Sequence, residues 1–134
     1  HRIVWRAYDA DDLLLLRMMA ERATDATFNS VLLNYYRDHN DSVGFHSDDE
    51  PELGATPTIG SISLGETRTL SFKPKARKDW KPVRIALESG SLLVMKGDTQ
   101  RNWRHAIAKE SQPRGPRVNL TFRLILTCLL YTSD

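Results

Sequence analysis

Polar and apolar residues alternate along a segment near the C-terminus, residues 117–124. Its polar positions are Arg117, Asn119, Thr121 and Arg123, and its apolar positions are Val118, Leu120, Phe122 and Leu124. Successive side chains of a β-strand point to opposite faces, so this pattern predicts a strand with one apolar face and one face bearing two guanidinium groups. The polar face either meets solvent, as in an ordinary half-exposed strand, or lines a cavity for a small dianion. A short dicarboxylate would suit such a cavity, because arginine binds carboxylates in bidentate geometry.

Upstream, the pattern predicts one helix, over residues 7–22. Asp9 can cap its first turn, and Asp11 and Asp12 favour the positive N-terminal end of a helix. The expected apolar stripe of this helix consists of Leu13, Leu14, Leu16, Met18 and Met19. We expect residues 24–27 to end it.

Short strand-like segments fill most of the remaining chain. The expected strands cover residues 28–36, 58–64, 67–73, 83–88, 91–95 and 103–107, in addition to the arginine-bearing strand. The almost fully apolar segment 91–95 is expected to be a central strand. Short strands separated by frequent turns favour an antiparallel barrel or jelly roll. We therefore expect a mainly β fold with one N-terminal helix.

Length and composition indicate one intracellular domain. The chain has 134 residues and a formal net charge of +2, too small to indicate a partner. We assign residues 1–126 to the domain and 127–134 to a patternless tail that could be non-native. The single cysteine, Cys128, excludes an internal disulfide and fits a reducing compartment. The chain has no apolar run of membrane-spanning length, and because it starts at His1 without methionine we expect a fragment.

Basic residues gather in the middle of the chain. They are Arg68, Lys73, Lys75, Arg77, Lys78, Lys81 and Arg84, followed more sparsely by Arg101, Arg104, Lys109 and Arg114. Such runs are usually solvated loop surface, but they could also contact phosphates.

A candidate metal site is formed by His46, Asp48 and His105. Histidine and aspartate two positions apart on an extended segment face the same way, and a histidine from a distant strand could join them. Two histidines and one carboxylate leave three coordination positions open, as in the non-haem Fe(II) oxygenases. The His-x-Asp motif alone is weak, and the acidic residues after it are often a solvated loop. The motif gains weight beside the two-arginine strand, which could bind a dicarboxylate co-substrate.

Asn34 and Tyr36 share one face of the strand expected at residues 28–36. They could offer an amide and a phenol to the same pocket. Alternatively, Asn34 is a polar strand-end residue and Tyr36 a packed aromatic with a hydrogen-bonded hydroxyl.

Together these motifs resemble the full signature of the AlkB family of 2-oxoglutarate- and Fe(II)-dependent dioxygenases. The matching motifs are Asn34-x-Tyr36, His46-x-Asp48, His105 and Arg117-x-Asn119-x-x-x-Arg123. The residues around them, 41–51 and 116–123, are most similar to the eukaryotic-type DNA and RNA demethylases of that family. The resemblance covers residues 28–124 and implies a double-stranded β-helix, or jelly roll.

The resemblance also implies roles for single residues. The Fe(II) ligands and catalytic centre would be His46, Asp48 and His105. Arg117, assisted by Tyr36, would bind the distal carboxylate of 2-oxoglutarate, and Arg123 would lie near the carboxylate at the metal. The residues expected to donate hydrogen bonds to this co-substrate are Asn34 and Asn119. Glu50 would lie beside the substrate base, on which His46 could stack.

The activity so implied is oxidative demethylation of an N-alkylated base in single- or double-stranded DNA or RNA. Dioxygen and 2-oxoglutarate would be consumed, and succinate, CO2 and formaldehyde released, by a protein expected to be monomeric. A base in a duplex would have to be flipped out of its stack. The same core could instead hydroxylate a protein or small molecule, or be a truncated, non-catalytic metal-binding jelly roll.

One part of the family pattern is missing from this sequence. Members carry a longer region before the strand at Phe28, which forms a nucleotide-recognition lid, and here 27 residues precede that strand. The aromatic residue expected to stack on the base has no counterpart, unless Trp5 or Tyr8 takes its place. Binding of iron and 2-oxoglutarate is therefore better supported by the sequence than nucleic-acid repair.

Overall fold

The computed structural model describes residues 2–5 and 11–126. Its strands are β1 (Arg2–Trp5), β2 (Ser30–Tyr36), β3 (Val43–His46), β4 (Ile59–Gly65), β5 (Arg68–Pro74), β6 (Val83–Leu87), β7 (Leu92–Met95), β8 (Trp103–Ile107) and β9 (Arg117–Arg123). Its helices are α1 (Asp11–Thr24), the 3-10 helix η1 (Pro51–Leu53) and α2 (Thr99–Asn102). Within this part of the chain, no helix is long and apolar enough to span a membrane.

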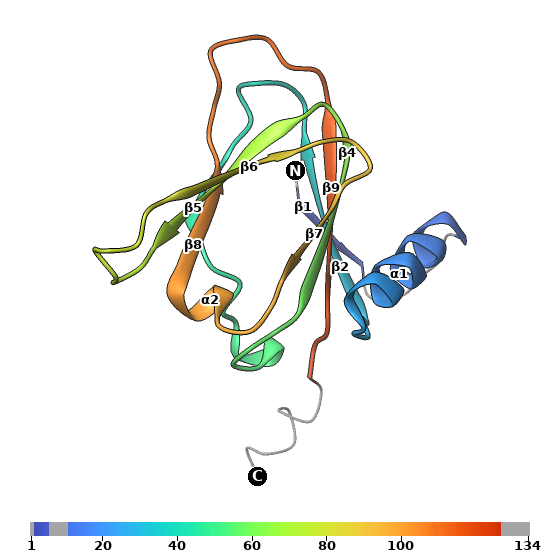
Figure 1. Cartoon of the computed structure of the whole chain (residues 1–134). Helices are drawn as coiled ribbons and strands as arrows, with labels where there is room; N and C mark the ends of the chain where they lie inside the picture. Colours follow the sequence, from blue (N-terminus) through green and yellow to red (C-terminus); the bar gives the residue numbers. More distant parts are fainter. Residues whose placement is uncertain (1, 6–10, 127–134) are drawn as a thin grey trace.

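The strands form two antiparallel sheets that face each other (Figure 1). The larger has the order β1-β2-β9-β4-β7, and the smaller has the order β3-β8-β5-β6. This arrangement confirms the predicted mainly β, jelly-roll class. The predicted strands agree closely with the observed ones, whereas β1, β3, η1 and α2 were not predicted as elements. At the C-terminal end, the Leu126 N–H donates to the Glu52 carbonyl at 2.7 Å, which attaches the end of the described chain to η1.

The arginine-bearing strand β9 lies at the centre of the larger sheet, between β2 and β4. Both of its faces are buried, so the half-exposed alternative for its polar side is wrong. On the outer face, Leu120 and Phe122 pack beneath α1 in a cluster that includes Leu13 and Ala20. On the inner face, Arg117 is only 2% exposed. The helix therefore seals one face of β9 and leaves its polar face to line the barrel.

Helix α1 begins within the predicted range and ends two residues beyond it. Residues 7–10, including the proposed cap Asp9, lie outside the described residues. The helix extends to Thr24, whose hydroxyl donates to the Ala20 carbonyl at 2.8 Å. The predicted buried stripe is partly wrong, because Met18 and Met19 are 53% and 57% exposed. Only the narrower stripe through Leu13 and Ala20 meets the sheet, since one face of a helix contacts a flat neighbour.

The apolar strand β7 is an edge strand, which corrects the prediction that it is central. The apolar composition of β7 results from contacts on both of its faces and not from a central position in the sheet. Leu92 packs against the cluster beneath α1, whereas Leu93 and Met95 belong to the second cluster, inside the barrel. Apolar surface covers both faces of β7, although only one of its edges is paired.

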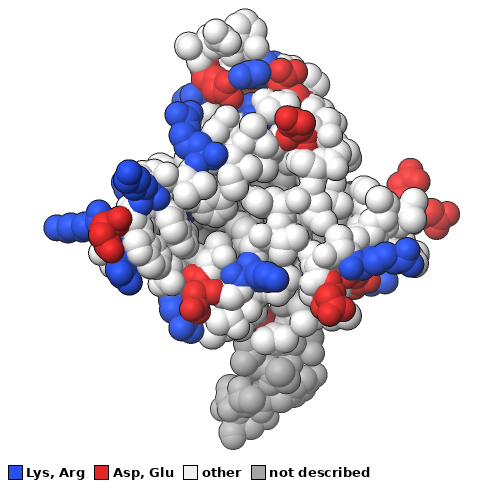
Figure 2. Space-filling view, in the orientation of Figure 1, with Lys and Arg blue, Asp and Glu red and all other residues white. Residues whose placement is uncertain are grey.

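The basic cluster of the sequence divides into two environments. Lysines and arginines of the β5–β6 hairpin are largely exposed and gather on the left of the molecule in Figure 2. Arg68, by contrast, has a fully buried side chain. The interpretation of the whole cluster as solvated surface is therefore wrong for Arg68.

Gly65 allows the end of β4 to approach the start of β9. Its φ is +98°, and a Cβ built there would lie 2.5 Å from the Pro116 carbonyl oxygen and 3.1 Å from the Arg117 Cα. The Glu66 N–H donates to that same carbonyl at 3.0 Å. A side chain at this position would therefore clash with the backbone that carries Arg117.

We expect Gly65→Ala to lower the free energy of unfolding by about 2–5 kcal/mol, through backbone strain and the clash with Pro116. Gly90→Ala is the matched control, because φ is +82° there but no atom lies within 4 Å of the added Cβ. Only backbone strain of about 1–2 kcal/mol should result at Gly90. Urea unfolding of both variants checks this, and equal losses would contradict the proposed contact.

Candidate active site

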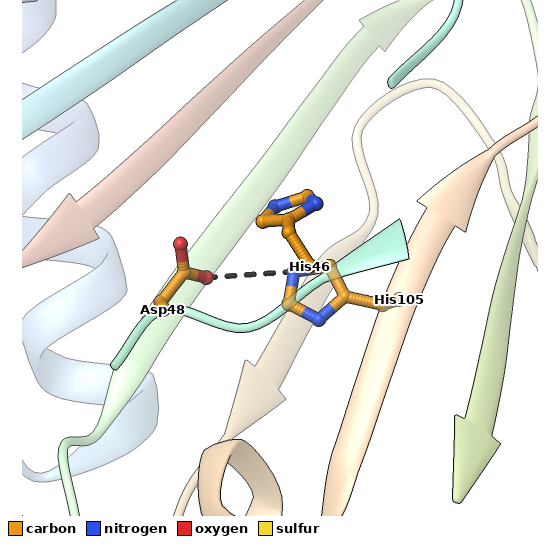
Figure 3. Close-up of side chains that lie close together, drawn as sticks. All are labelled: His46, Asp48 and His105. Carbon is orange, nitrogen blue, oxygen red and sulfur yellow. Dashed lines mark ion pairs between the residues drawn. The ribbon is translucent and has the colours of Figure 1, made fainter. Parts of the chain in front are cut away.

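The side chains of His46, Asp48 and His105 meet inside the barrel (Figure 3). One potential ligand atom from each lies within 4.8 Å of the other two. The ring centroids of the two histidines are 4.4 Å apart, and the His105 Nε2 is 3.5 Å from the Asp48 Oδ2. Asp48 and His105 are buried, and His46 is nearer the solvent. The structure thus brings together the three residues that the sequence proposed.

Strand pairing produces this convergence. His46, the last residue of β3, lies directly opposite His105 on β8, so both imidazoles leave the same face of the smaller sheet. The register shifts between Val43 and His46, an irregularity of the β-bulge type that redirects side chains. Asp48 lies two residues beyond His46 on extended chain and points back to the same place.

Short hydrogen bonds fix the segment that carries His46 and Asp48. The His46 Nδ1 is 2.8 Å from the Gly44 carbonyl, which favours a proton on Nδ1 and leaves Nε2 free to bind a metal. The Asp48 N–H donates to the Gln100 Oε1 at 2.8 Å, and the Ser47 hydroxyl donates to the Trp103 carbonyl at 2.7 Å. Gln100 on α2 is 2% exposed and was missed, since nothing in its sequence surroundings marks it.

Asp98 and Asn102 are close to His105 in the sequence but make their contacts elsewhere. Asp98 pairs with Arg101 at 3.4 Å, and the Asn102 carbonyl accepts the Lys75 N–H at 2.9 Å. The His105 Nδ1 has no hydrogen-bond partner among the described residues.

Asp48 carries its negative charge in a buried place. Burial alone would raise the pKa of this carboxyl, but the hydrogen bond and charge of His105, with His46 and Arg123, outweigh it. The net effect holds the pKa of Asp48 below its ordinary value. An ionised carboxylate beside two imidazoles is a donor set that suits Fe(II) and leaves positions open for other ligands.

A cavity of about 290 Å³ extends from this triad into the barrel. Its lining includes the triad and four further predicted site residues, Asn34, Tyr36, Arg117 and Asn119. The two remaining predicted residues, Glu50 and Arg123, are not part of the lining and pair with each other at 3.4 Å. The predicted residues therefore form two groups, one inside the cavity and one beside the metal site.

Arg117 offers unpaired hydrogen-bond donors in the cavity. Its Nη2 donates to the Ser63 hydroxyl at 3.0 Å, but Nε and Nη1 have no hydrogen-bond partner among the described residues. Its guanidinium carbon lies 4.8 Å from the Tyr36 ring centroid. Burial lowers the pKa of Arg117 and the nearby Tyr36 opposes this effect. A buried cation with free N–H groups is costly unless an anion pairs with it, and a carboxylate matches its geometry.

Asn119 is engaged by the protein itself. Its amide nitrogen donates to the Ser61 hydroxyl at 2.7 Å, and its amide oxygen accepts from the Thr121 hydroxyl at 2.8 Å. In the structure, this side chain ties β9 to β4. The predicted hydrogen bond from Asn119 to a co-substrate stays a prediction.

A sequence model of the family described as the 2OG-Fe(II) oxygenase superfamily matches residues 3–123. The chain belongs to this superfamily. Among curated proteins it is 48% identical to the alpha-ketoglutarate-dependent dioxygenase alkB homolog 3 of Mus musculus over 120 residues. It is 42% identical to the DNA oxidative demethylase ALKBH2 of Homo sapiens over 109 residues. These relatives confirm the AlkB resemblance predicted from the motifs.

These matches cover 84% and 77% of this chain, but only 42% of each relative. The chain thus spans about two fifths of the length of these relatives. A solved structure of OsALKBH1 shares the fold, with a TM-score of 0.65 at 22% identity. That match covers 82% of this chain and 64% of the solved chain.

We expect Asp48→Asn to weaken binding of Fe(II), or of Mn(II) as its substitute, by more than about 100-fold, because the anionic ligand is lost. Asp49→Asn is the control, since it removes an exposed neighbouring carboxylate whose nearest cation, Lys75, is 4.0 Å away. Anaerobic calorimetric titration measures both affinities. Equal metal affinity in the two variants would contradict the assignment of Asp48 as a ligand.

Proposed function

We propose that this chain is the catalytic core of an Fe(II)- and 2-oxoglutarate-dependent dioxygenase that demethylates N-alkylated bases in nucleic acid. One observation carries the proposal: a two-histidine, one-carboxylate triad and a buried guanidinium with free N–H groups line a single cavity. The first suits Fe(II), and the second suits the far carboxylate of a keto diacid.

In this proposal the iron is held by His46, Asp48 and His105. Bound iron supplies the redox chemistry by which dioxygen decarboxylates 2-oxoglutarate to succinate and a substrate C–H bond is hydroxylated. The chain's own residues bind and orient. Arg117 and Tyr36 hold the distal carboxylate, which places the keto acid's other end toward the triad. Asn34 lines the cavity between the two ends.

Arg123 and Glu50 act beside the metal site in this proposal. Arg123 is buried, and its charge contributes to the lowered pKa of Asp48, so it could also attract a carboxylate bound near Asp48. The Glu50 Oε1 accepts a hydrogen bond from Arg123, while its Oε2 is buried without a hydrogen-bond partner among the described residues. That oxygen could accept an N–H of a substrate base, and His46, nearer the solvent, could stack on the base.

A polyanionic substrate is favoured by the outer face of the smaller sheet. Lys73 on β5 and Arg104 on β8 are exposed and lie directly opposite each other, although like charges in such pairs are destabilising. Neither has an ion-pair partner among the residues described here. Exposed Phe45 lies beside them, with the Lys73 ammonium 5.5 Å from its ring centroid. Cations next to an aromatic ring suit the phosphates and bases of a single strand.

We further propose that the protein is monomeric and intracellular. The support for the compartment is the single cysteine, which fits reducing conditions.

We expect the chain to release formaldehyde and succinate when given Fe(II), 2-oxoglutarate and an oligonucleotide with N-methylated bases. Arg117→Ala should raise the 2-oxoglutarate concentration needed for half-maximal rate by about 100-fold or more, because a buried carboxylate partner is lost. A formaldehyde assay with varied 2-oxoglutarate measures this.

His46→Ala is the inactive control for this assay. Succinate release stimulated by a peptide or small molecule, but not by methylated oligonucleotide, would replace the nucleic-acid substrate with another class. Metal binding without any 2-oxoglutarate turnover would identify a non-catalytic jelly roll.

We expect the double variant Lys73→Ala/Arg104→Ala to weaken binding of a single-stranded oligonucleotide and to reduce the slope of log affinity against log salt by about 1–2. Arg22→Ala/Lys109→Ala is the charge-matched control, because both residues are exposed on other parts of the surface. Fluorescence anisotropy at several salt concentrations measures both. An identical slope in the two double variants would exclude the outer face of the smaller sheet as a phosphate-binding surface.

A further inference from the structure

Arg68, at the start of β5, is a buried cation outside the predicted site. Its side chain is fully buried and its guanidinium is extensively hydrogen bonded. The Nε donates to the Glu110 Oε2 at 2.9 Å and the Nη1 donates to the Asp38 carbonyl at 3.2 Å. The Nη2 donates to the carbonyls of Asp41 and Ala108, at 3.0 and 2.8 Å. Each guanidinium nitrogen therefore has a partner.

The acceptors of Arg68 lie in two loops that flank the arginine end of the cavity. Residues 37–42 join β2, which carries Tyr36, to β3, which carries His46. Residues 108–116 join β8 to β9 and lead directly into Arg117. The two loops also contact each other, since the Glu110 N–H donates to the His39 carbonyl at 3.0 Å. A single guanidinium thus holds both loops against β5.

Arg68 and Arg117 share the Tyr36 ring. Their guanidinium carbons lie 5.6 Å and 4.8 Å from its centroid, at distances typical of cation–π contacts. The two arginines differ in how many of their guanidinium nitrogens have hydrogen-bond partners. Arg68 is paired at every nitrogen, whereas Arg117 keeps Nε and Nη1 without a hydrogen-bond partner in the described part of the chain. Arg68 can therefore hold other residues in position, whereas Arg117 has N–H groups available to bind a ligand.

Glu110 extends the contacts of Arg68 along the loop before β9. Its Oε1 accepts from the Arg114 Nε at 2.9 Å, and the Arg114 Nη1 lies 3.4 Å from the Glu66 Oε1. Glu66 follows Gly65, which is paired with Arg117 across β4 and β9. This series of ion pairs therefore connects Arg68 to the segment of β4 that is paired with Arg117.

We propose that Arg68 is a positioning residue for the keto-acid co-substrate, holding Tyr36 and the two loops so that the free N–H groups of Arg117 face the distal carboxylate. This inference rests on the proposed function, because it takes Arg117 as the carboxylate ligand. It assigns Arg68 no contact with the co-substrate, since its own donors are occupied. The hydrogen bonds of Arg68, and not its charge alone, perform this role.

The test measures 2-oxoglutarate binding by calorimetry on the whole chain loaded with Mn(II), together with Mn(II) affinity itself. Arg68→Met should weaken 2-oxoglutarate binding about tenfold and leave Mn(II) affinity within about twofold. Arg68→Lys keeps a buried cation but cannot reach all the acceptors, so it should weaken 2-oxoglutarate binding at least about threefold. Arg84→Met, at an exposed arginine on β6, is the control and should change neither affinity.

Unchanged metal affinity would separate positioning from a general loss of fold, because the proposed metal ligands lie on β3, on β8 and just after β3 in the same barrel. Wild-type 2-oxoglutarate affinity in Arg68→Lys would overturn the inference, and this variant decides the matter if Arg68→Met does not fold. Parallel loss of Mn(II) and 2-oxoglutarate binding would also overturn it. Arg117→Met tests the proposed function separately: if the unmodified chain binds no 2-oxoglutarate, or Arg117→Met binds it normally, the proposed co-substrate site fails first.

Discussion

The guanidinium of Arg117 is buried inside the barrel, and this buried charge constrains the groups packed around it. A cation inside a barrel must be surrounded by groups that compensate its lost hydration. Here the Tyr36 ring and the Ser63 hydroxyl do so only in part, and two nitrogens remain without partners among the described residues. The fold maintains this arrangement because β9 is the middle strand of its sheet and α1 seals the opposite face with apolar side chains. The remaining free donors make the cavity suited to an anion.

At the other end of the cavity lies the negative charge of the Asp48 carboxylate. Asp48 stays ionised in a buried place because His105, His46 and Arg123 surround it. Cross-strand pairing of β3 with β8 sets the two imidazoles side by side, and Gln100 fixes the backbone that carries Asp48. A site with one carboxylate and two imidazoles at one end and a guanidinium at the other suits a metal ion and a keto diacid bound side by side. This polarity supports the proposed chemistry more than any one residue does.

The apolar core is divided so that the barrel can hold polar groups. One cluster lies between α1 and the larger sheet, and a second lies inside the barrel around Leu70, Phe72 and Ile107. The first cluster binds the helix to the sheet without contributing to the cavity. Members of the second cluster, including Leu70, Met95 and Ile107, also line the cavity, and such apolar surroundings strengthen electrostatic interactions inside it.

The sequence alone was enough to propose candidate site residues that the structure brings together, since alternation along β9 and the His46-x-Asp48 motif are local patterns that strand geometry converts into shared faces. It also determined the mainly β class and most strand positions. Three features became visible only in the folded chain: both faces of β9 are buried, β7 is an edge strand, and Arg68 is buried whereas its basic neighbours are largely exposed. The reason is physical: alternation specifies which side chains share a face, but what covers that face depends on segments distant in the chain. Gln100 illustrates the same limit, because a hydrogen bond to residue 48 across 52 positions leaves no local pattern.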